Sequence, residues 1–380
     1  MLFELNEEQE FLQRTTARFL DEHTPADGLR RLRQDARGFE TPYWQQGAGL
    51  GWNSLLVSED DGGVAVSDSG LIDLTLVAYE FGRHAAPGPL LSNSVVTGAL
   101  SAAGSHGPLV AELMDGSAVA AFCHSEAGPG DGLTGVDLKI EVDDDALVLS
   151  GVKRPVEAAN SASHLLVTGR TAGGLTQVVV PTSTAGVSLS PMRCVDLTRR
   201  YSVVAFDRVR VPLSCAVGPI GEAAQAVERQ LQQAIVILNA ETTGAMQRAF
   251  EMTVEWAFDR YSFGRPLASY QALKHRFAHM ATWLEASHAI ADEAAVAVAD
   301  GRSEAGLLVS AAKAYLGEVG PELLQEAVQL HGGIGVTFEH DLHIYLRRVT
   351  LNRTLFGTPD AHRRRIAGFV AEQEGAHAAQ

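Results

Sequence analysis

The sequence has few cysteines and no long apolar segment. Its three cysteines, Cys123, Cys194 and Cys215, lie far apart and in no metal-ligand spacing. Scattered thiols in odd number are typical of a reducing compartment, so we expect a cytoplasmic protein without a disulfide framework or a metal site. No run approaches the roughly 18 uncharged apolar residues of a membrane span, and no basic N-terminal region precedes an apolar run. We therefore expect neither a membrane span nor a signal peptide.

Basic residues are also scarce relative to acidic ones. The chain of 380 residues carries 30 Lys and Arg against 46 Asp and Glu, a formal net charge of -16. This balance excludes a nucleic-acid-binding protein, which needs a basic face to replace the counterions of the phosphate backbone. It does not exclude a small anionic ligand, because a local arginine can hold one.

Two common catalytic signatures are missing. No G-x-S-x-G sequence occurs, so a serine hydrolase of that type is excluded. His275 and His279 share one face of a predicted helix, but Arg276 stands where a zinc protease needs glutamate. We interpret this histidine pair as surface residues.

The periodicity of apolar residues divides the chain into three parts. Helical spacing dominates the first third, short β-rich runs separated by turn residues begin near Ala118, and long helical segments return from about Glu222. The sequence thus predicts an α+β multidomain protein. Its expected parts are an N-terminal helical domain (1–116), a middle antiparallel β-barrel or sandwich (117–218) and a C-terminal four-helix bundle (219–380).

Two stretches in the C-terminal part stand out. Arg260-Tyr261-Ser262-Phe263-Gly264 interrupts a long helical pattern. Its arginine offers a planar fork to phosphate oxygens, and its phenylalanine offers an aromatic face. Gln329-Leu330-His331-Gly332-Gly333-Ile334-Gly335 is rich in glycine, which lets a backbone approach a ligand closely. The alternative for each stretch is a plain turn between helices.

Taken together and in this order, the two stretches resemble the acyl-CoA dehydrogenase family. That family carries an R-x-x-F-G turn, a following F/Y-Q and a Q-x-x-G-G loop, which correspond here to Arg260–Gly264, Tyr270-Gln271 and Gln329–Gly333. The similarity extends along nearly the whole chain. Further matches are Asp61-Gly62-Gly63, Glu80–Arg83, Phe122–Glu126 and Asp196–Arg200.

The resemblance implies FAD as cofactor, an acyl-CoA thioester as substrate and electron-transfer flavoprotein as electron acceptor. It also implies a tetramer in which each FAD lies across a dimer interface. On this mapping, Phe122, His124, Ser125, Thr358 and Asp360 bind the FAD of their own chain. A second set binds the FAD of the neighbouring subunit: Arg260, Phe263, Gln271, Gln329, Gly332 and Gly333.

The sequence departs from the family where the catalytic base is expected. The base is a glutamate that removes the α-proton of the thioester. Phe356 occupies one of the two family positions for it, just before Gly357-Thr358, and Ala234 occupies the other. Glu241 lies about two helical turns beyond Ala234 on the same face and is the remaining candidate base. The alternative for Glu241 is a buried structural glutamate or a helix–helix ion pair.

The segments expected against the flavin ring depart as well. Lys153-Arg154-Pro155-Val156-Glu157 replaces the usual Lys-x-Trp-Ile-Thr, and Glu126-Ala127-Gly128 replaces Glu-Pro-Gly. Three hypotheses follow. The chain is an acyl-CoA dehydrogenase, or a subunit of one, that forms a 2,3-enoyl-CoA. It is a non-catalytic partner that completes the FAD sites of a homologous subunit in a heterotetramer. Or it is an oxygen-using flavin oxidase or monooxygenase of the same fold.

Overall fold

The structure is a computed structural model that describes residues 4–128 and 132–378. The chain forms two compact units. The sheet unit comprises Glu7–Leu74 and Pro87–Ala234. The helical unit comprises Thr75–Ala86, the segment from Ile235 onward and a few N-terminal residues. The predicted boundaries of three separate domains stay a prediction.

The first part of the sheet unit is helical. Its helices are α1 (Glu7–His23), α2 (Ala26–Leu32), α3 (Thr41–Ala48), α5 (Leu90–Ala102) and α6 (Gly107–Met114). Acidic residues in the first turn of α1 suit the positive end of the helix dipole, and its buried residues recur every three or four positions. Helix α5 is buried along nearly its whole length and packs against strand β1.

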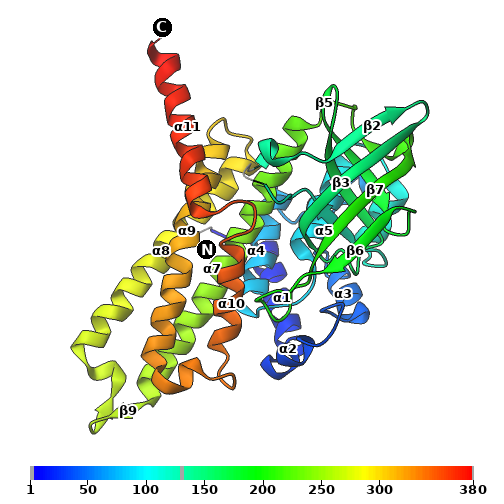
Figure 1. Cartoon of the computed structure of the whole chain (residues 1–380). Coiled ribbons are helices and arrows are strands. Elements are labelled where there is room, and N and C mark those ends of the chain that lie inside the picture. The colour runs from blue at the N-terminus through cyan, green and yellow to red at the C-terminus, as the bar shows by residue number, and fades with distance from the viewer. Residues whose placement is uncertain (1–3, 129–131, 379–380) are drawn as a thin grey trace. The chain divides into compact units, whose positions relative to one another are not determined.

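The sheet unit also contains an eight-stranded sheet with the order β6-β7-β3-β2-β4-β5-β8, in which β1 pairs with β4 (Figure 1). Most neighbours are antiparallel, but β1 and β2 run parallel to β4, so the sheet is mixed rather than purely antiparallel. The alternation of side chains within a strand carries no information about direction, which is why the sequence did not reveal these two pairs. The strands are β1 (Ala120–Cys123), β2 (Lys139–Asp143), β3 (Ala146–Glu157), β4 (His164–Thr171), β5 (Gly174–Pro181), β6 (Val187–Pro191), β7 (Tyr201–Pro212) and β8 (Ala216–Val217).

Long antiparallel helices build the helical unit. Its elements are the second half of α4 (Gly70–Arg83), most of α7 (Ala224–Asp259), the hairpin β9–β10 (Tyr261–Ser262 and Arg265–Pro266), α8 (Gln271–Ala299), α9 (Ala305–His331), α10 (Leu342–Asn352) and α11 (Pro359–Ala378). Helix α9 packs against α8, α10 and α11. The order of helices, then strands, then a helical bundle confirms the predicted fold class. No helix in the described ranges is long and apolar enough to cross a membrane.

Helices α4 and α7 cross within the helical unit with their backbones in contact. A Cβ atom built on Gly82 would lie 1.9 Å from the carbonyl oxygen of Glu241. One built on Gly244 would lie 2.0 Å from the carbonyl oxygen of Tyr79. Because these neighbours are backbone atoms of helices, neither can move aside locally. The crossing therefore requires glycine on both helices.

This close crossing predicts the effect of adding one methyl group. Gly244→Ala should lower the free energy of unfolding by about 1–3 kcal/mol, since the new Cβ forces the two backbones apart. Gly368→Ala is the matched control, because a Cβ there meets no atom within 4 Å and alanine favours a helix by up to about 1 kcal/mol. Urea unfolding of both variants measures the difference. Equal stability of the two variants would contradict the tight crossing.

Candidate functional site

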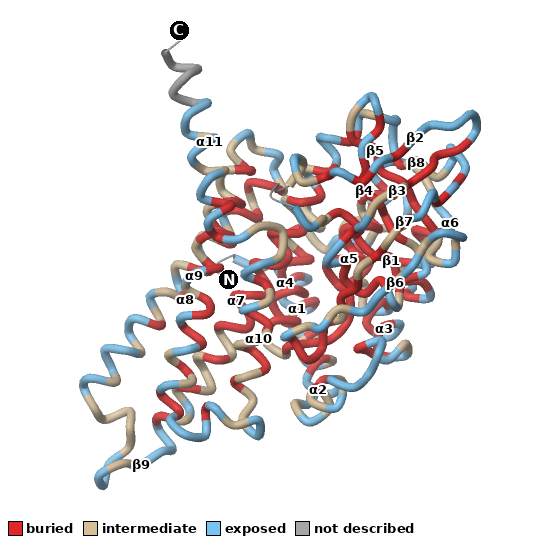
Figure 2. The backbone as a smooth tube through the Cα atoms, viewed as in Figure 1, coloured by how far each residue is buried: buried red, intermediate tan, exposed pale blue. Residues whose placement is uncertain are grey.

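The residues expected to bind a neighbour's cofactor gather at one end of the helical unit. This donor end comprises Arg260, Phe263, Gln271, Gln329, Gly332 and Gly333, all of them exposed. Because α7, α8 and α9 alternate in direction, the end of α7, the hairpin, the start of α8 and the end of α9 meet there (Figure 1). The same end carries a long exposed stretch around β9 (Figure 2). Residues about 70 positions apart in sequence thus share one surface.

The hairpin of the donor end holds an aromatic ring in solvent. Phe263 lies at the turn with a φ of +50° and is 97% exposed. A left-handed backbone at a non-glycine residue costs roughly 1–2 kcal/mol, so the surroundings must impose it. The pairing of Ser262 with Arg265 does so, because it leaves a two-residue loop, and such a hairpin turn takes a positive φ at both loop residues. Tyr270 supports the hairpin: its hydroxyl donates to the Ser262 carbonyl at 2.6 Å, and the Arg265 guanidinium lies 3.9 Å from the centre of its ring. The hairpin thus sets the backbone of Phe263 and leaves its ring available to contact another molecule.

The glycine turn that follows α9 suits a phosphate group. Gly332 has a φ of +65°, which favours glycine, and a Cβ built on Gly332 or Gly333 would meet no atom within 4 Å. Packing inside the chain therefore does not explain Gly333, and open space remains for a ligand to approach its backbone. The Arg260 guanidinium and the two glutamine amides form a donor set that fits the pyrophosphate of FAD.

The residues expected to bind the flavin within the chain fall in both units. In the sheet unit, Phe122 and His124 stack with ring centres 5.7 Å apart, and the backbone carbonyl of Ser125 accepts the backbone N–H of Arg154 at 2.8 Å. In the helical unit, Thr358 accepts the N–H of Ala361 at the start of α11. Asp360, also at the start of α11, accepts a hydrogen bond from Arg363 at 3.0 Å. Each of these residues thus has a partner inside the chain.

Buried ion pairs occupy the segments that depart from the family near the flavin. Lys153 is fully buried and donates to the Glu126 carboxylate at 2.6 Å and to the His124 carbonyl at 2.8 Å. Glu157, which stands in place of the usual threonine, forms a buried ion pair with Arg199. These partners were not predicted, although Arg199 lies in the Asp196–Arg200 segment. The substituted Glu157 is therefore paired with Arg199, and Lys153 and Glu126, which keep the family's residue types, are paired with each other. Both ion pairs anchor this part of the sheet unit.

Glu241 takes part in a buried ion pair as well. Arg348 donates to its Oε1 at 2.5 Å, and the Asn352 amide donates to its Oε2 at 3.3 Å. Arg348 also donates to the carbonyl oxygens of Ala85 and Ala86 at 3.1 Å each. Glu241 is 2% exposed and Arg348 is 0% exposed. Both carboxylate oxygens are thus engaged, and this geometry favours the helix–helix ion pair over the catalytic base.

The two family positions for the base carry no substitute carboxylate. Ala234 is buried, and Phe356 has a φ of +56° with its carbonyl oxygen 3.0 Å from His362 Nε2. Among the described residues of the helical unit, Glu80 and Glu241 are the buried carboxylates. Each of them lies beside an arginine. Within the part of this unit that the structure describes, each buried carboxylate therefore has an arginine within 3.8 Å.

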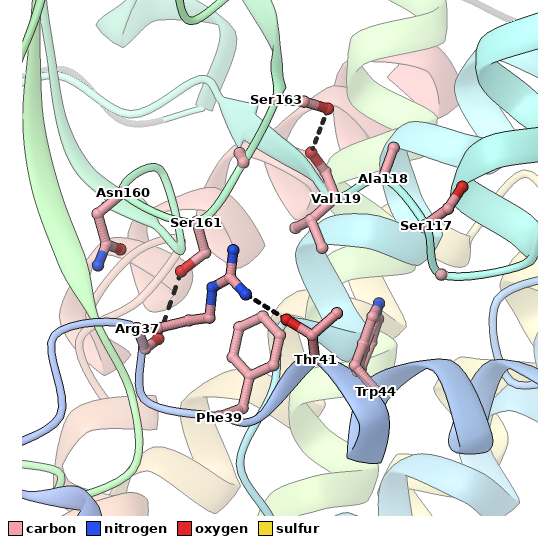
Figure 3. Close-up of a pocket in the computed structure, with 12 residues that line it drawn as sticks. Arg37, Phe39, Thr41, Trp44, Ser117, Ala118, Val119, Asn160, Ser161 and Ser163 are labelled. Carbon is pink, nitrogen blue, oxygen red and sulfur yellow. Dashed lines mark hydrogen bonds between the residues drawn. The ribbon is translucent and has the colours of Figure 1, made fainter.

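The sheet unit also contains a separate pocket of about 380 Å³. Figure 3 shows Arg37 pointing into it above Phe39, with Thr41 and Ser161 on either side. Arg37 donates to the Thr41 hydroxyl, and the Ser161 hydroxyl donates to the Arg37 carbonyl at 3.4 Å. None of the predicted site residues lines this pocket, and these polar groups bond mainly to one another. We assign it no part in the flavin site.

The buried ion pair generates a stability prediction. Arg348→Met should lower the free energy of unfolding by about 3–5 kcal/mol, because it leaves the Glu241 charge buried without compensation. The double variant Arg348→Met/Glu241→Leu removes both charges and should recover most of that loss. Urea unfolding of the parent, the single variant and the double variant measures these differences in the free energy of unfolding. A double variant as unstable as the single one would contradict this account.

His124 generates a prediction about pH. Burial, with a smaller contribution from Lys153, lowers the pKa of His124 from 6.5 to about 3. Below pH 6.5 the unfolded chain therefore binds a proton at this residue that the folded chain does not, so stability falls as the pH falls. From pH 7 to pH 5 this residue should contribute a loss of about 2 kcal/mol. His124→Gln retains a donor for the Gly132 carbonyl. Between pH 7 and pH 5, urea unfolding should show a smaller loss of unfolding free energy in this variant than in the parent. An equal loss in the two proteins would contradict the prediction.

Comparison with known proteins shows the family of this chain. The acyl-CoA dehydrogenase N-terminal domain matches residues 6–107, and the acyl-CoA dehydrogenase C-terminal domain matches residues 217–371. Acyl-CoA dehydrogenase IpdE2 of Mycobacterium tuberculosis is 29% identical over 373 residues, covering 96% of this chain and 98% of IpdE2.

Solved structures share the fold over nearly the whole chain. A variant of the Tcur3481-Tcur3483 steroid ACAD is 27% identical with a TM-score of 0.88, covering 97% of this chain and 99% of that one. The ChsE4-ChsE5 complex of Mycobacterium tuberculosis, at 22% identity, has a TM-score of 0.87 and covers 98% of this chain and 99% of that chain. Fold, domain matches and relatives agree that this chain belongs to the acyl-CoA dehydrogenase family.

Proposed function

We propose that this chain is a subunit of an FAD-dependent acyl-CoA dehydrogenase and that it completes the FAD site of a homologous subunit. The assembled enzyme oxidises an acyl-CoA thioester to a 2,3-enoyl-CoA and passes the electrons to electron-transfer flavoprotein. One contrast supports this proposal above all. The donor end is complete and exposed, whereas the buried carboxylates of the helical unit are committed to arginines.

The chemistry divides between the two subunits. Dehydrogenation requires a carboxylate that removes the α-proton, and FAD, when bound, accepts the β-hydrogen as hydride. This chain supplies binding groups. The Arg260 guanidinium pairs with phosphate oxygens, Gln271 and Gln329 offer amide donors, and Phe263 covers an apolar surface of the ligand. The base then comes from the homologous subunit.

Two further observations support a partner of this kind. The Tcur3481-Tcur3483 and ChsE4-ChsE5 structures are each named for two chains. The three cysteines of this chain are free, which suits assembly in the reducing cytoplasm.

The competing possibility is that this chain runs the reaction in its own pocket, with Glu241 as base. It requires Arg348 and Asn352 to release the carboxylate, which they hold at 2.5 and 3.3 Å.

Purifying the chain alone and within its native assembly distinguishes the partner role from catalysis in the chain's own pocket. We expect the chain alone to retain little FAD and to show no turnover, while the assembly contains a homologous chain and dehydrogenates acyl-CoA. An active yellow protein from the chain alone would overturn the partner role, and loss of its turnover in Glu241→Gln would then identify the base. Oxygen consumption without an added acceptor would instead indicate an oxidase.

The donor role predicts a specific loss in the assembly. Arg260→Ala should weaken FAD binding roughly 10-fold to 100-fold, because one charge-assisted hydrogen bond contributes about 1.5–3 kcal/mol. Arg302→Ala is the matched control, since the side chain of that half-buried arginine bonds to acidic residues around the turn between α8 and α9. The ratio of flavin to protein and the FAD dissociation constant measure both. Unchanged FAD binding in Arg260→Ala would count against the donor role.

A further inference from the structure

Trp256 contacts both motifs of the donor end. It lies one helical turn before Arg260, whose backbone N–H bonds to the Trp256 carbonyl at 2.9 Å. The Arg260 guanidinium lies 5.8 Å from the centre of the indole ring. The His331 imidazole stacks on the same residue, with ring centres 5.3 Å apart and an interplanar angle of 18°. One aromatic side chain therefore joins the end of α7 to the end of α9.

His331 is itself firmly placed. Its Nδ1 lies 2.8 Å from the Ala327 carbonyl, and its ring meets the His340 ring edge-on with centres 4.5 Å apart. Burial lowers the pKa of His331, so the imidazole that stacks on Trp256 is neutral near pH 7. In sequence His331 stands between Gln329 and Gly332. The position of its ring therefore fixes the glycine turn relative to helix α7.

We propose that Trp256 is a positioning residue for the donor end: its indole ring sets the separation between Arg260 and the glycine turn, so that both reach the same FAD. The inference rests on the proposed function. Arg260 is exposed and its side chain is long, so ordering it on a ligand costs up to about 2 kcal/mol of rotamer entropy. A flat aromatic partner restricts it before the ligand binds, which strengthens binding without any new contact to FAD.

The proposed positioning role depends on the aromatic ring of Trp256 and not on its indole nitrogen. Trp256 Nε1 is buried and has no hydrogen-bond partner among the residues that the structure describes. No hydrogen bond therefore holds the indole in place, and its contacts with Arg260 and His331 are those of an aromatic ring. Phenylalanine offers such a ring and leucine does not. The two substitutions therefore separate positioning by the ring from simple filling of space.

The test compares four variants in the flavin-containing assembly with FAD itself as the probe. Trp256→Leu should raise the FAD dissociation constant roughly fivefold to tenfold, the equivalent of losing one cation–π contact and one stacked pair. Trp256→Phe should stay within about twofold of the parent. Phe250→Leu is the control for packing, because it breaks an α7–α8 aromatic pair, Phe250–Phe277, without touching Arg260 or His331. Arg260→Ala reports on the donor site itself.

Each pattern of results has a distinct meaning. Weaker FAD binding in Arg260→Ala and Trp256→Leu, with the other two close to the parent, supports the positioning role. A loss in Arg260→Ala without one in Trp256→Leu overturns the inference and leaves the proposed function standing. Equal losses in both Trp256 variants and Phe250→Leu also overturn it, because they indicate general damage to the bundle. Unchanged binding in Arg260→Ala sinks the proposed function first.

Discussion

The buried ion pair between Glu241 and Arg348 organises the helical unit. It connects α7 to α10, and the same guanidinium holds the two carbonyl oxygens of Ala85 and Ala86 that follow α4. Removing two charges from water costs several kcal/mol per ion, so such a pair specifies an arrangement more than it adds stability. The arrangement it specifies is the relative position of three helices. Because α10 follows the glycine turn, the ion pair also limits where that turn can lie.

The same use of acidic residues recurs in the sheet unit. Glu126 is bound to Lys153, and Glu157 is bound to Arg199, at the segments where the family usually lines the flavin ring. A carboxylate that neutralises a buried cation cannot leave that partner at low cost, and it is therefore poorly suited to move a proton during a reaction. Lys153 and Glu126 keep the residue types of the family patterns, whereas Glu157 stands in place of the usual threonine. Both ion pairs are internal anchors near the expected flavin ring.

Much of this structure could be predicted from the sequence, and the misses have physical causes. The helical periodicity identified the long helices, and the family motifs identified residues that the structure brings to one end. The pairing of Glu241 with Arg348 could not be predicted, because 107 residues separate the two and no local pattern links them. The parallel pairing of β1 with β4 escaped for a similar reason, since it depends on the path of the chain rather than on the composition of either strand. The left-handed backbone of Phe263 was not predicted, because it follows from the pairing of Ser262 with Arg265, which leaves a two-residue hairpin loop.

Exposed apolar side chains in the donor end and just after its glycine turn add an argument about assembly. Phe263 is 97% exposed and Val336 is 77% exposed, an arrangement that costs free energy in water and is offset when another subunit covers them. A homo-oligomer would bring together several copies of a chain whose net charge is -16, and their mutual repulsion opposes the gain from burial. A less acidic homologous subunit would bury the same surface with less repulsion. Charge and apolar exposure therefore support the proposed role of this chain as one subunit of an unlike pair.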